Sequence, residues 1–370
     1  MRHLRMAKGL MAFSAAFMLF GAAAQAADET AISNLSMEPV SGKLFREVPR
    51  PVTWTVDVNI EAPYPGSPLV TPVKEIQASL PKEMSFNPDP KMPVCPDSAI
   101  GPGSNLSIAP ESVIALCPDS VLGNGTAEHY LAGANGPNGP TLTDAVVIVF
   151  NGGRTAGGLP TIKVYGYSKT AATGIYMVGV LKNGRLGVSI PVLPLDSATA
   201  AFHLSIPGRE ESHKERRGLD PNYVRATCAN RVWKARVGFV LGTRGTAGNA
   251  TGTESTIQAP PISVPCTGAA GRAQLSRPEV KGSASVKAGA MAVYRVMLKN
   301  SGTATARGLE VSASGKGASG RAPAGTLAPG KSRSVKLKVR FRKPGRSKIR
   351  FKVSGARINA VSAVRRVQVR

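Results

Sequence analysis

The feature that most constrains this fold is a strict alternation of apolar and cationic residues within residues 334–355. Apolar side chains occupy every second position over 335–341 and again over 349–353, with Lys or Arg between them. A period of two predicts β-strands with one buried and one exposed face. Pro344-Gly345 interrupts the period and predicts a hairpin turn. The predicted cationic face of this hairpin, a candidate polyanion-binding site, is Lys336, Lys338, Arg340, Arg342, Lys348, Arg350 and Lys352.

The charge of the chain is distributed unevenly. Residues 271–370 contain 24 Lys and Arg against two acids, whereas residues 27–270 contain 20 of each sign. Such an asymmetry indicates anionic partners, and the alternative is solvated charge that keeps strand edges from pairing. The expected partners are anionic surface polymers or lipid headgroups. Intracellular nucleic acid is not expected, because the chain starts with an export signal and no aromatic residues interleave the cations.

The first 26 residues have the pattern of a signal peptide. A basic start is followed by an apolar run over 10–20, and Ala24-Gln25-Ala26 has the form of a cleavage site before Ala27. No later stretch approaches about 20 apolar residues, so we expect no transmembrane segment after removal of the signal. The predicted location is secreted, extracellular or in the cell envelope.

Four cysteines follow: Cys95, Cys117, Cys228 and Cys266. In an exported chain they predict two disulfides, and no C-x₂-C pair favours a metal. Three connectivities are possible. We favour Cys95–Cys117 and Cys228–Cys266, because these pairs close the shorter loops.

The composition favours many short strands. The 370 residues include 40 Gly and 29 Pro, which suits turns rather than long helices. Alternation over 52–61, a continuous apolar run over 145–150 and Asn183-Gly184 between two apolar segments predict strands and a type I′ hairpin. We therefore predict an all-β chain with an antiparallel, disulfide-stapled β-sandwich over 27–266, either one large sandwich or two fused ones.

A second module is predicted after a linker at 267–276. Residues 277–370 are expected to form a smaller, basic sandwich of about seven strands, with a loop of small residues over 315–330. Over 287–341 the stretch K-A-G-x-M-A-V-Y-R-V-x-L-K-N-S-G and the later L-A-P-G-K-S-R-S-V-K-L-K-V resemble immunoglobulin-like repeats of bacterial surface and adhesion proteins. This resemblance implies an immunoglobulin-like fold and a secreted setting, and it implies no catalytic residue.

The first module is similar in layout to uncharacterised exported actinobacterial proteins. The likeness covers residues 80–130 and 228–266 and lies in an L-P…N-P…C…C-P-x-S-x-x-G-x-G pattern. That group of proteins implies no function.

Candidate chemistry is sparse. The three histidines after the signal are His129, expected to follow a Gly123-Asn124-Gly125 turn, His203, expected in an apolar strand, and His213, in a charged loop. Asp97 and Asp119 follow the two Cys-Pro steps, and we interpret them as turn or capping residues rather than as paired carboxylates. There is no G-x-S-x-G, H-E-x-x-H or P-loop motif, so no catalytic residue, metal or cofactor is predicted.

The predicted function is therefore that of a non-enzymatic envelope or adhesion-type protein whose cationic C-terminal domain contacts anionic cell-surface polymers. The alternative is a secreted hydrolase or carbohydrate-binding sandwich with a basic docking domain. A pair of carboxylates about 5–10 Å apart in a cleft would favour the hydrolase.

Overall fold

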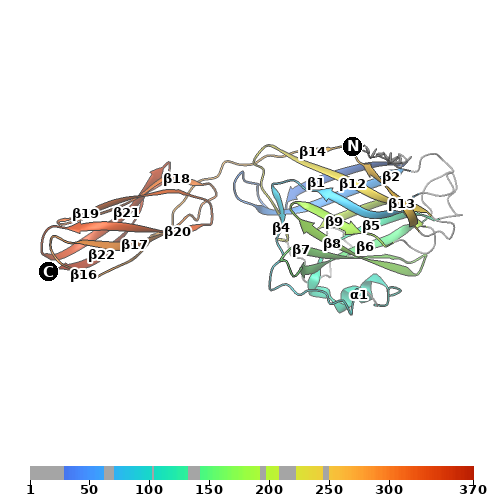
Figure 1. Ribbon diagram of the computed structural model, residues 1–370, viewed down its shortest axis with the longest axis horizontal. Helices are drawn as coiled ribbons and strands as arrows, with labels where there is room; N and C mark the ends of the chain where they lie inside the picture. Colours follow the sequence, from blue (N-terminus) through green and yellow to red (C-terminus); the bar gives the residue numbers. More distant parts are fainter. Residues whose placement is uncertain are drawn as a thin grey trace, which may run out of the picture.

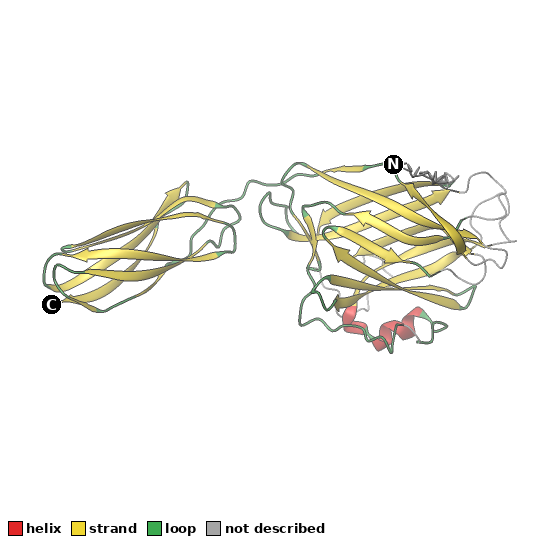
Figure 2. Cartoon of the chain, in the orientation of Figure 1, coloured by secondary structure: helices red, strands yellow, loops and turns green. Residues whose placement is uncertain are grey.

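The computed structural model describes residues 29–61, 71–101, 104–131, 142–191, 197–207, 222–244 and 250–370. Within these ranges the chain is all-β, with two sheets, a short helix α1 (Pro110–Leu116) and a single 3₁₀ turn η1 (Pro118–Ser120) (Figure 2). The predicted all-β, antiparallel class is confirmed. The predicted signal peptide and His213 lie outside the described residues. No helix in the described ranges is both long and apolar enough to cross a membrane.

The N-terminal body contains one sheet of fourteen strands in the described residues (Figure 1). Its main path runs β13-β12-β3-β9-β8-β7-β6-β5-β10-β2-β11-β4, with β1 paired to β2 and β14 paired to β12. Its strands are β1 (Thr30–Pro39), β2 (Arg50–Glu61), β3 (Val73–Ser79), β4 (Met84–Phe86), β5 (Val121–Leu131), β6 (Leu142–Arg154), β7 (Pro160–Ser168), β8 (Thr173–Lys182), β9 (Arg185–Ser189), β10 (Ser197–Ile206), β11 (Val224–Ala226), β12 (Val232–Arg244), β13 (Ala250–Gln258) and β14 (Ile262–Pro265).

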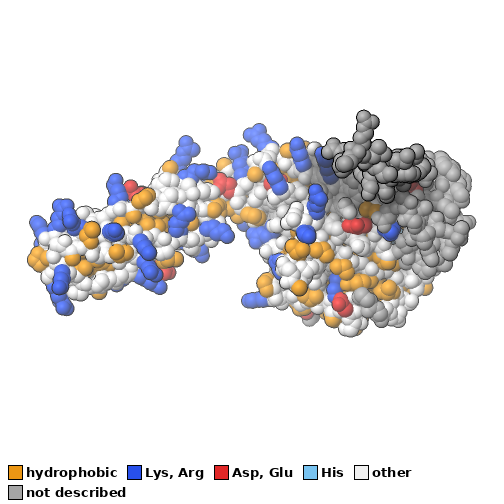
Figure 3. Space-filling view, viewed as in Figure 1, with side chains coloured by type: hydrophobic (Ala, Val, Ile, Leu, Met, Phe, Trp, Pro, Cys, Tyr) orange, Lys and Arg blue, Asp and Glu red, His pale blue; other side chains and the backbone are white. Residues whose placement is uncertain are grey.

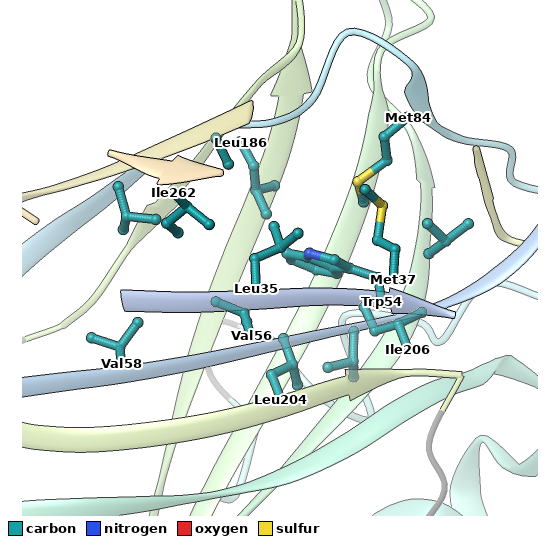
Figure 4. Packing of buried hydrophobic residues seen from close by; sticks show 14 of the residues in the cluster. Leu35, Met37, Trp54, Val56, Val58, Met84, Leu186, Leu204, Ile206 and Ile262 are labelled. Carbon is teal, nitrogen blue, oxygen red and sulfur yellow. The ribbon is translucent and has the colours of Figure 1, made fainter. Parts of the chain in front are cut away.

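This sheet folds over so that its two ends come together around the core. Strand β1, beside β2, contacts β13 and β14 from the other end of the path. The enclosed core includes Trp54 of β2, which lies among Met37, Met84 and Ile206 (Figure 4). The sequence left open whether the first module is one body or two, and the structure shows one continuous sheet around one main core.

Several local predictions are confirmed in this body. The alternating apolar residues of β2 from Trp54 to Ile60 are buried. In the apolar run of β6, residues 147–150 are all buried. The hairpin between β8 and β9 turns at Asn183 and Gly184, with φ of 53° and 75°. These positive φ values are those a type I′ turn requires, and Asn-Gly adopts them at little cost.

The predicted turn at Gly123-Asn124-Gly125 is wrong, because these residues lie inside β5. A Cβ at Gly123 would come 2.2 Å from the carbonyl oxygen of Ser205, and one at Gly125 would come 1.8 Å from that of His203. The glycines therefore let β10 approach β5 closely, and a glycine pair in a strand can have this role as well as that of a turn. His129 consequently lies in a strand.

A disulfide-stapled segment covers the outer side of β5, β6 and β7. Cys95–Cys117 joins residues on either side of α1, and Cys228–Cys266 joins the segment just before β12 to the residue just after β14, as predicted. The Tyr165 hydroxyl donates to the carbonyl oxygens of Leu106 and Ile108, at 3.0 and 2.6 Å. Burial raises the pKa of Tyr165 to about 12, so this anchor stays a hydrogen-bond donor at neutral pH.

The C-terminal body contains a second sheet of eight strands, all in the continuously described residues 250–370. The order is β15-β17-β20-β19-β18-β21-β22-β16. Its strands are β15 (Glu279–Lys281), β16 (Ser285–Val286), β17 (Met291–Lys299), β18 (Ala306–Gly315), β19 (Ala318–Leu327), β20 (Ser332–Phe341), β21 (Gly345–Ala356) and β22 (Val361–Val369). Two layers of this folded sheet enclose a separate core, in which the Tyr294 ring packs 6.4 Å from Phe341 and 5.2 Å from Phe351.

The predicted hairpin of the two cationic strands is wrong. Strand β20 pairs with β17 and β19, while β21 pairs with β18 and β22. The chain crosses from one layer to the other between Phe341 and Gly345. Both strands turn their apolar sides into the shared core, so their cations point outward from opposite layers. The local alternation is correct, but it does not encode which strands pair.

One further expectation needs correction. Residues 315–330 are not a loop of small residues, because β19 pairs along most of its length with β18.

The predicted linker at 267–276 is held at both ends. Ala269 donates to the Leu44 carbonyl of the N-terminal body, whereas Leu275 is buried in the C-terminal core. One further contact joins the bodies, since Glu47 Oε2 accepts from Thr305 N at 2.7 Å and from the Thr305 hydroxyl.

Candidate functional site

The N-terminal body encloses a cavity of about 260 Å³ that is partly open to solvent. Its described walls come from β2, β3, β5 to β10 and β12, so both parts of the folded sheet contribute. The walls are almost entirely apolar. No lysine, arginine, aspartate or glutamate lines the cavity among the described residues.

Small residues in the cavity wall leave room where a packed core would have large side chains. Ala127, Ala145 and Gly166 line it from three neighbouring strands, and Ala78 lines it from β3. Along β7 the side chains divide between two tasks: Ile162, Val164 and Gly166 face the cavity, while Lys163 and Tyr165 hold the disulfide-stapled segment. The strand alternation therefore separates a lining face from an anchoring face.

Four hydrogen-bonding side chains of the lining come from strand ends on one side of the sheet. His129 of β5 lies opposite Thr199 of β10, and Ser168 of β7 lies opposite Thr173 of β8. His129 is buried, and burial lowers the pKa of its imidazole because the charged form loses hydration. At neutral pH the imidazole is uncharged.

Sequence analysis identified His129 but not the cavity. Its walls come from strands that are distant in the chain and that alternate like any strand with one buried face. The signal that was present is the number of Ala and Gly residues at inward positions. That signal becomes specific only when the strand pairing is known.

The predicted polyanion-binding residues are all exposed, and they form two faces instead of one. We define the β17/β20 face as Arg295, Lys336, Lys338 and Arg340, and the β21 face as Lys348, Arg350, Lys352 and Arg366. Arg342 belongs to neither face, because it lies in the exposed connection from β20 to β21. Figure 3 shows Lys and Arg side chains distributed along the C-terminal body with few acids among them.

Each face places like charges directly opposite each other on paired strands. Lys336 lies opposite Arg295, and Lys348 lies opposite Arg366. Cross-strand pairs of like charge are destabilising. In residues 255–370, whose side chains are all described, the one ion pair is Arg321–Glu310 at 3.1 Å. No cation of the two defined faces therefore forms an ion pair with a described acid.

The two faces differ in their apolar content. On the β17/β20 face, Met291 and Val293 are 59% and 51% exposed and lie opposite Arg340 and Lys338. On the β21 face, Val364 is exposed and lies opposite Arg350. The β17/β20 face thus combines its cations with more exposed apolar surface than the β21 face does.

The remaining candidates have structural partners. Lys163 Nζ donates to the Cys95 carbonyl at 2.6 Å and to the Asp97 carboxylate, so Asp97 helps to fix the segment after Cys95. Asp119 lies in η1. His203 Nδ1 is 2.6 Å from Asp57 Oδ1 at the outer side of the sheet. In the described ranges no group of three or more His, Cys, Asp or Glu side chains is placed to hold a metal.

Comparisons with known proteins do not identify a family. No family model and no curated protein matches this chain. Among solved structures, the CARDB domain of a Pyrococcus furiosus protein, solved in complex with di-metal ions, is 21% identical over 27% of this chain and 90% of its own, with a TM-score of 0.23. Red sea bream transglutaminase is 11% identical over 91% of this chain and 31% of its own, with a TM-score of 0.24.

Proposed function

We propose that this chain is an exported, non-catalytic binding protein of the cell envelope. Its N-terminal body binds a small apolar ligand, and its C-terminal body contacts anionic surface polymers. The observation that carries the first part is the apolar cavity of about 260 Å³. Small-molecule sites in proteins are concave and mostly apolar with a few polar groups that fix orientation, and this cavity has that composition.

The walls of the cavity support binding rather than hydrolysis. A glycosidase of the common type needs two carboxylates flanking the bond it cleaves, and the described lining contains no carboxylate. A hydroxyl nucleophile needs an adjacent base. The lining hydroxyl of Ser168 instead donates to Asp144 at 2.7 Å and accepts from the Ala171 amide, so it belongs to a turn. We therefore prefer the binding function to the hydrolase alternative.

A matched pair of substitutions tests cavity binding. Val164→Phe projects into the cavity, whereas Val178→Phe places the same added volume on the outer side of the adjacent strand, where Val178 is exposed. A polarity-sensitive fluorescent probe, displaced by nonane, measures occupancy in the full-length protein. We expect wild type and Val178→Phe to bind the probe and Val164→Phe to lose at least tenfold in affinity. Absence of probe binding to the folded wild type would refute the proposal.

The second part rests on the unpaired cations of the C-terminal body. Neighbouring cations of one face are about 5–7 Å apart, which is within the Debye length of about 10 Å at 0.1 M salt. Their fields therefore add. An anionic polymer that contacts four of them should lose roughly 10²-fold in affinity between 50 and 200 mM salt, because condensed counterions are released on binding.

Because the two faces lie on opposite layers, we expect each to bind polymer separately. In full-length protein, a triple Glu variant of Lys336, Lys338 and Arg340 should halve the stoichiometry for a teichoic-acid-type polymer. The matched triple variant of Lys348, Arg350 and Lys352 should have the same effect, and the sixfold variant should abolish binding. Retention of the sixfold variant equal to wild type would leave solvated charge as the explanation. Binding to anionic vesicles but not to polymer would identify a lipid partner instead.

A further inference from the structure

The cavity is lined by different groups at its two ends. At one end the Trp54 ring lies among the apolar side chains shown in Figure 4, and its indole Nε1 makes no hydrogen bond to a described residue. At the other end His129 and Thr199 face each other across β5 and β10. On β10, Ile206 lies opposite Trp54 and Thr199 lies opposite His129. At about 3.3 Å per strand residue, the two ends are roughly 20 Å apart. The shape therefore fits an extended molecule better than a compact one.

His129 is a buried polar side chain with no hydrogen bond to the part of the chain that the structure describes. It is 8% exposed, it lines the cavity, and its imidazole makes no hydrogen bond to any described residue. The nearby Ser168, by contrast, is satisfied by Asp144 and the Ala171 amide. Buried polar groups in native proteins are nearly always hydrogen-bonded, and an exception requires an explanation. A ligand whose polar end reaches His129 provides that explanation.

We infer that the cavity binds a linear, uncharged amphiphile of about ten non-hydrogen atoms, with a hydroxyl group hydrogen-bonded to His129 and an alkyl chain that extends from there along part of the cavity in the direction of Trp54. This inference rests on the proposed binding function of the same cavity. The size follows from comparison with an engineered cavity of about 150 Å³ that holds one benzene molecule of six carbons. A cavity of about 260 Å³ then holds about ten such atoms.

The hydroxyl is favoured over a carboxylate by the chemistry of the pocket. A neutral imidazole has one donor and one acceptor nitrogen, and a hydroxyl group can pair with either. A carboxylate would bring a charge into a lining that contains no Lys or Arg among the described residues. Burying a charge without a counter-charge is strongly unfavourable. A fatty alcohol or a comparable neutral molecule therefore fits, and an ionised fatty acid does not.

The test compares three probes on the full-length protein: octan-1-ol, nonane, in which a methyl group replaces the hydroxyl, and octanoate at pH 8. Each affinity is measured by displacement of the fluorescent probe. His129→Leu removes both hydrogen-bonding nitrogens at similar size, and His129→Gln retains a donor and an acceptor. His203→Leu is the matched control, because His203 lies on the outer side of the neighbouring strand.

We expect His129→Leu to weaken octan-1-ol roughly 5- to 10-fold relative to nonane, as for the loss of one hydrogen bond. His129→Gln should restore most of this difference, His203→Leu should not change it, and octanoate should bind wild type most weakly. An alcohol-to-alkane ratio that is equal in wild type and His129→Leu would overturn the inference, as would tighter binding of octanoate than of octan-1-ol. Either result, obtained while nonane still binds the wild type, would leave the proposed binding function of the cavity intact. Failure of all three probes on wild type would instead refute the proposed function itself.

Discussion

The two bodies of this protein are built from the same kind of strand but have different interiors. In the C-terminal body, Tyr294, Phe341 and Phe351 fill the space between the layers, and each is fully buried. In the N-terminal body, inward positions such as Ala145 and Gly166 leave a cavity between the walls. An apolar period of two predicts a buried face in both cases. The size of the side chains on that face decides whether the interior is packed or hollow.

Their outer surfaces differ as much as their interiors. Acids and bases are equal in number over residues 27–270, while 24 bases accompany two acids over 271–370. The division of charge and the division of interior volume therefore coincide. This difference indicates two separate tasks, with apolar ligand binding inside the first body and anion contact outside the second.

The largest expected effect comes from a charge in the packed core. Phe351→Asp should unfold the C-terminal body, with a loss of more than about 4 kcal/mol, because an unpaired carboxylate replaces a fully buried ring. Lys352→Asp, at the next and exposed position, should change stability by less than about 0.5 kcal/mol. Thermal unfolding followed by calorimetry distinguishes them. Simultaneous loss of the N-terminal transition in Phe351→Asp would break the separation between the bodies.

A smaller effect is expected from the disulfides, which belong to the N-terminal body alone. The double variant Cys228→Ser/Cys266→Ser should lower the stability of this body by about 2–5 kcal/mol, since the bridge closes a separation of 38 residues. Residues 271–370 contain no cysteine, so their transition should not move. Denaturant unfolding with and without reductant checks this. A shift of the C-terminal transition on reduction would contradict it.

The smallest effect concerns the contact between the bodies. The hydrogen bond from the Thr305 hydroxyl is the main cause that lowers the pKa of Glu47, and the contact therefore favours the ionised carboxylate. It should be intact above the ordinary pKa of a glutamate and lost as the pH falls through the lowered value. We expect acid, or Glu47→Gln at neutral pH, to increase limited proteolysis at Ala270–Gly271 a few-fold.

The exposed Glu111 in α1 offers a control, since Glu111→Gln changes the same group far along the chain from the contact. First cleavage inside 287–370 would show that the C-terminal body is not a separate folded unit.

The sequence predicts local structure well where the cause is local. The alternation in β2, the Asn183-Gly184 turn and the two disulfides are all found in the structure. The errors arise where the cause is distant. Pro344-Gly345 fits a hairpin as well as a crossing between layers, and only the packing of both apolar faces on one core decides between them. Gly123 and Gly125 suggest a turn unless the approach of β10 is known.

The candidate site was less predictable than the fold for the same reason. The exposure of the seven predicted cations follows from alternation and is correct, but their division into two faces depends on pairing. His129 has no sequence motif. Its importance comes from strands β5, β6 and β10, which place it beside Leu142 and Thr199 in a common wall.

The central claim, that the two bodies perform two separate binding tasks, is tested most directly by calorimetry of the full-length protein with each ligand in turn. At 100 times its dissociation constant a ligand stabilises the body that binds it by about 2.7 kcal/mol. We predict two transitions, of which octan-1-ol raises only that of the N-terminal body and an anionic polymer at low salt raises only that of the C-terminal body. Both ligands raising the same transition, or neither raising the N-terminal one, would contradict the account.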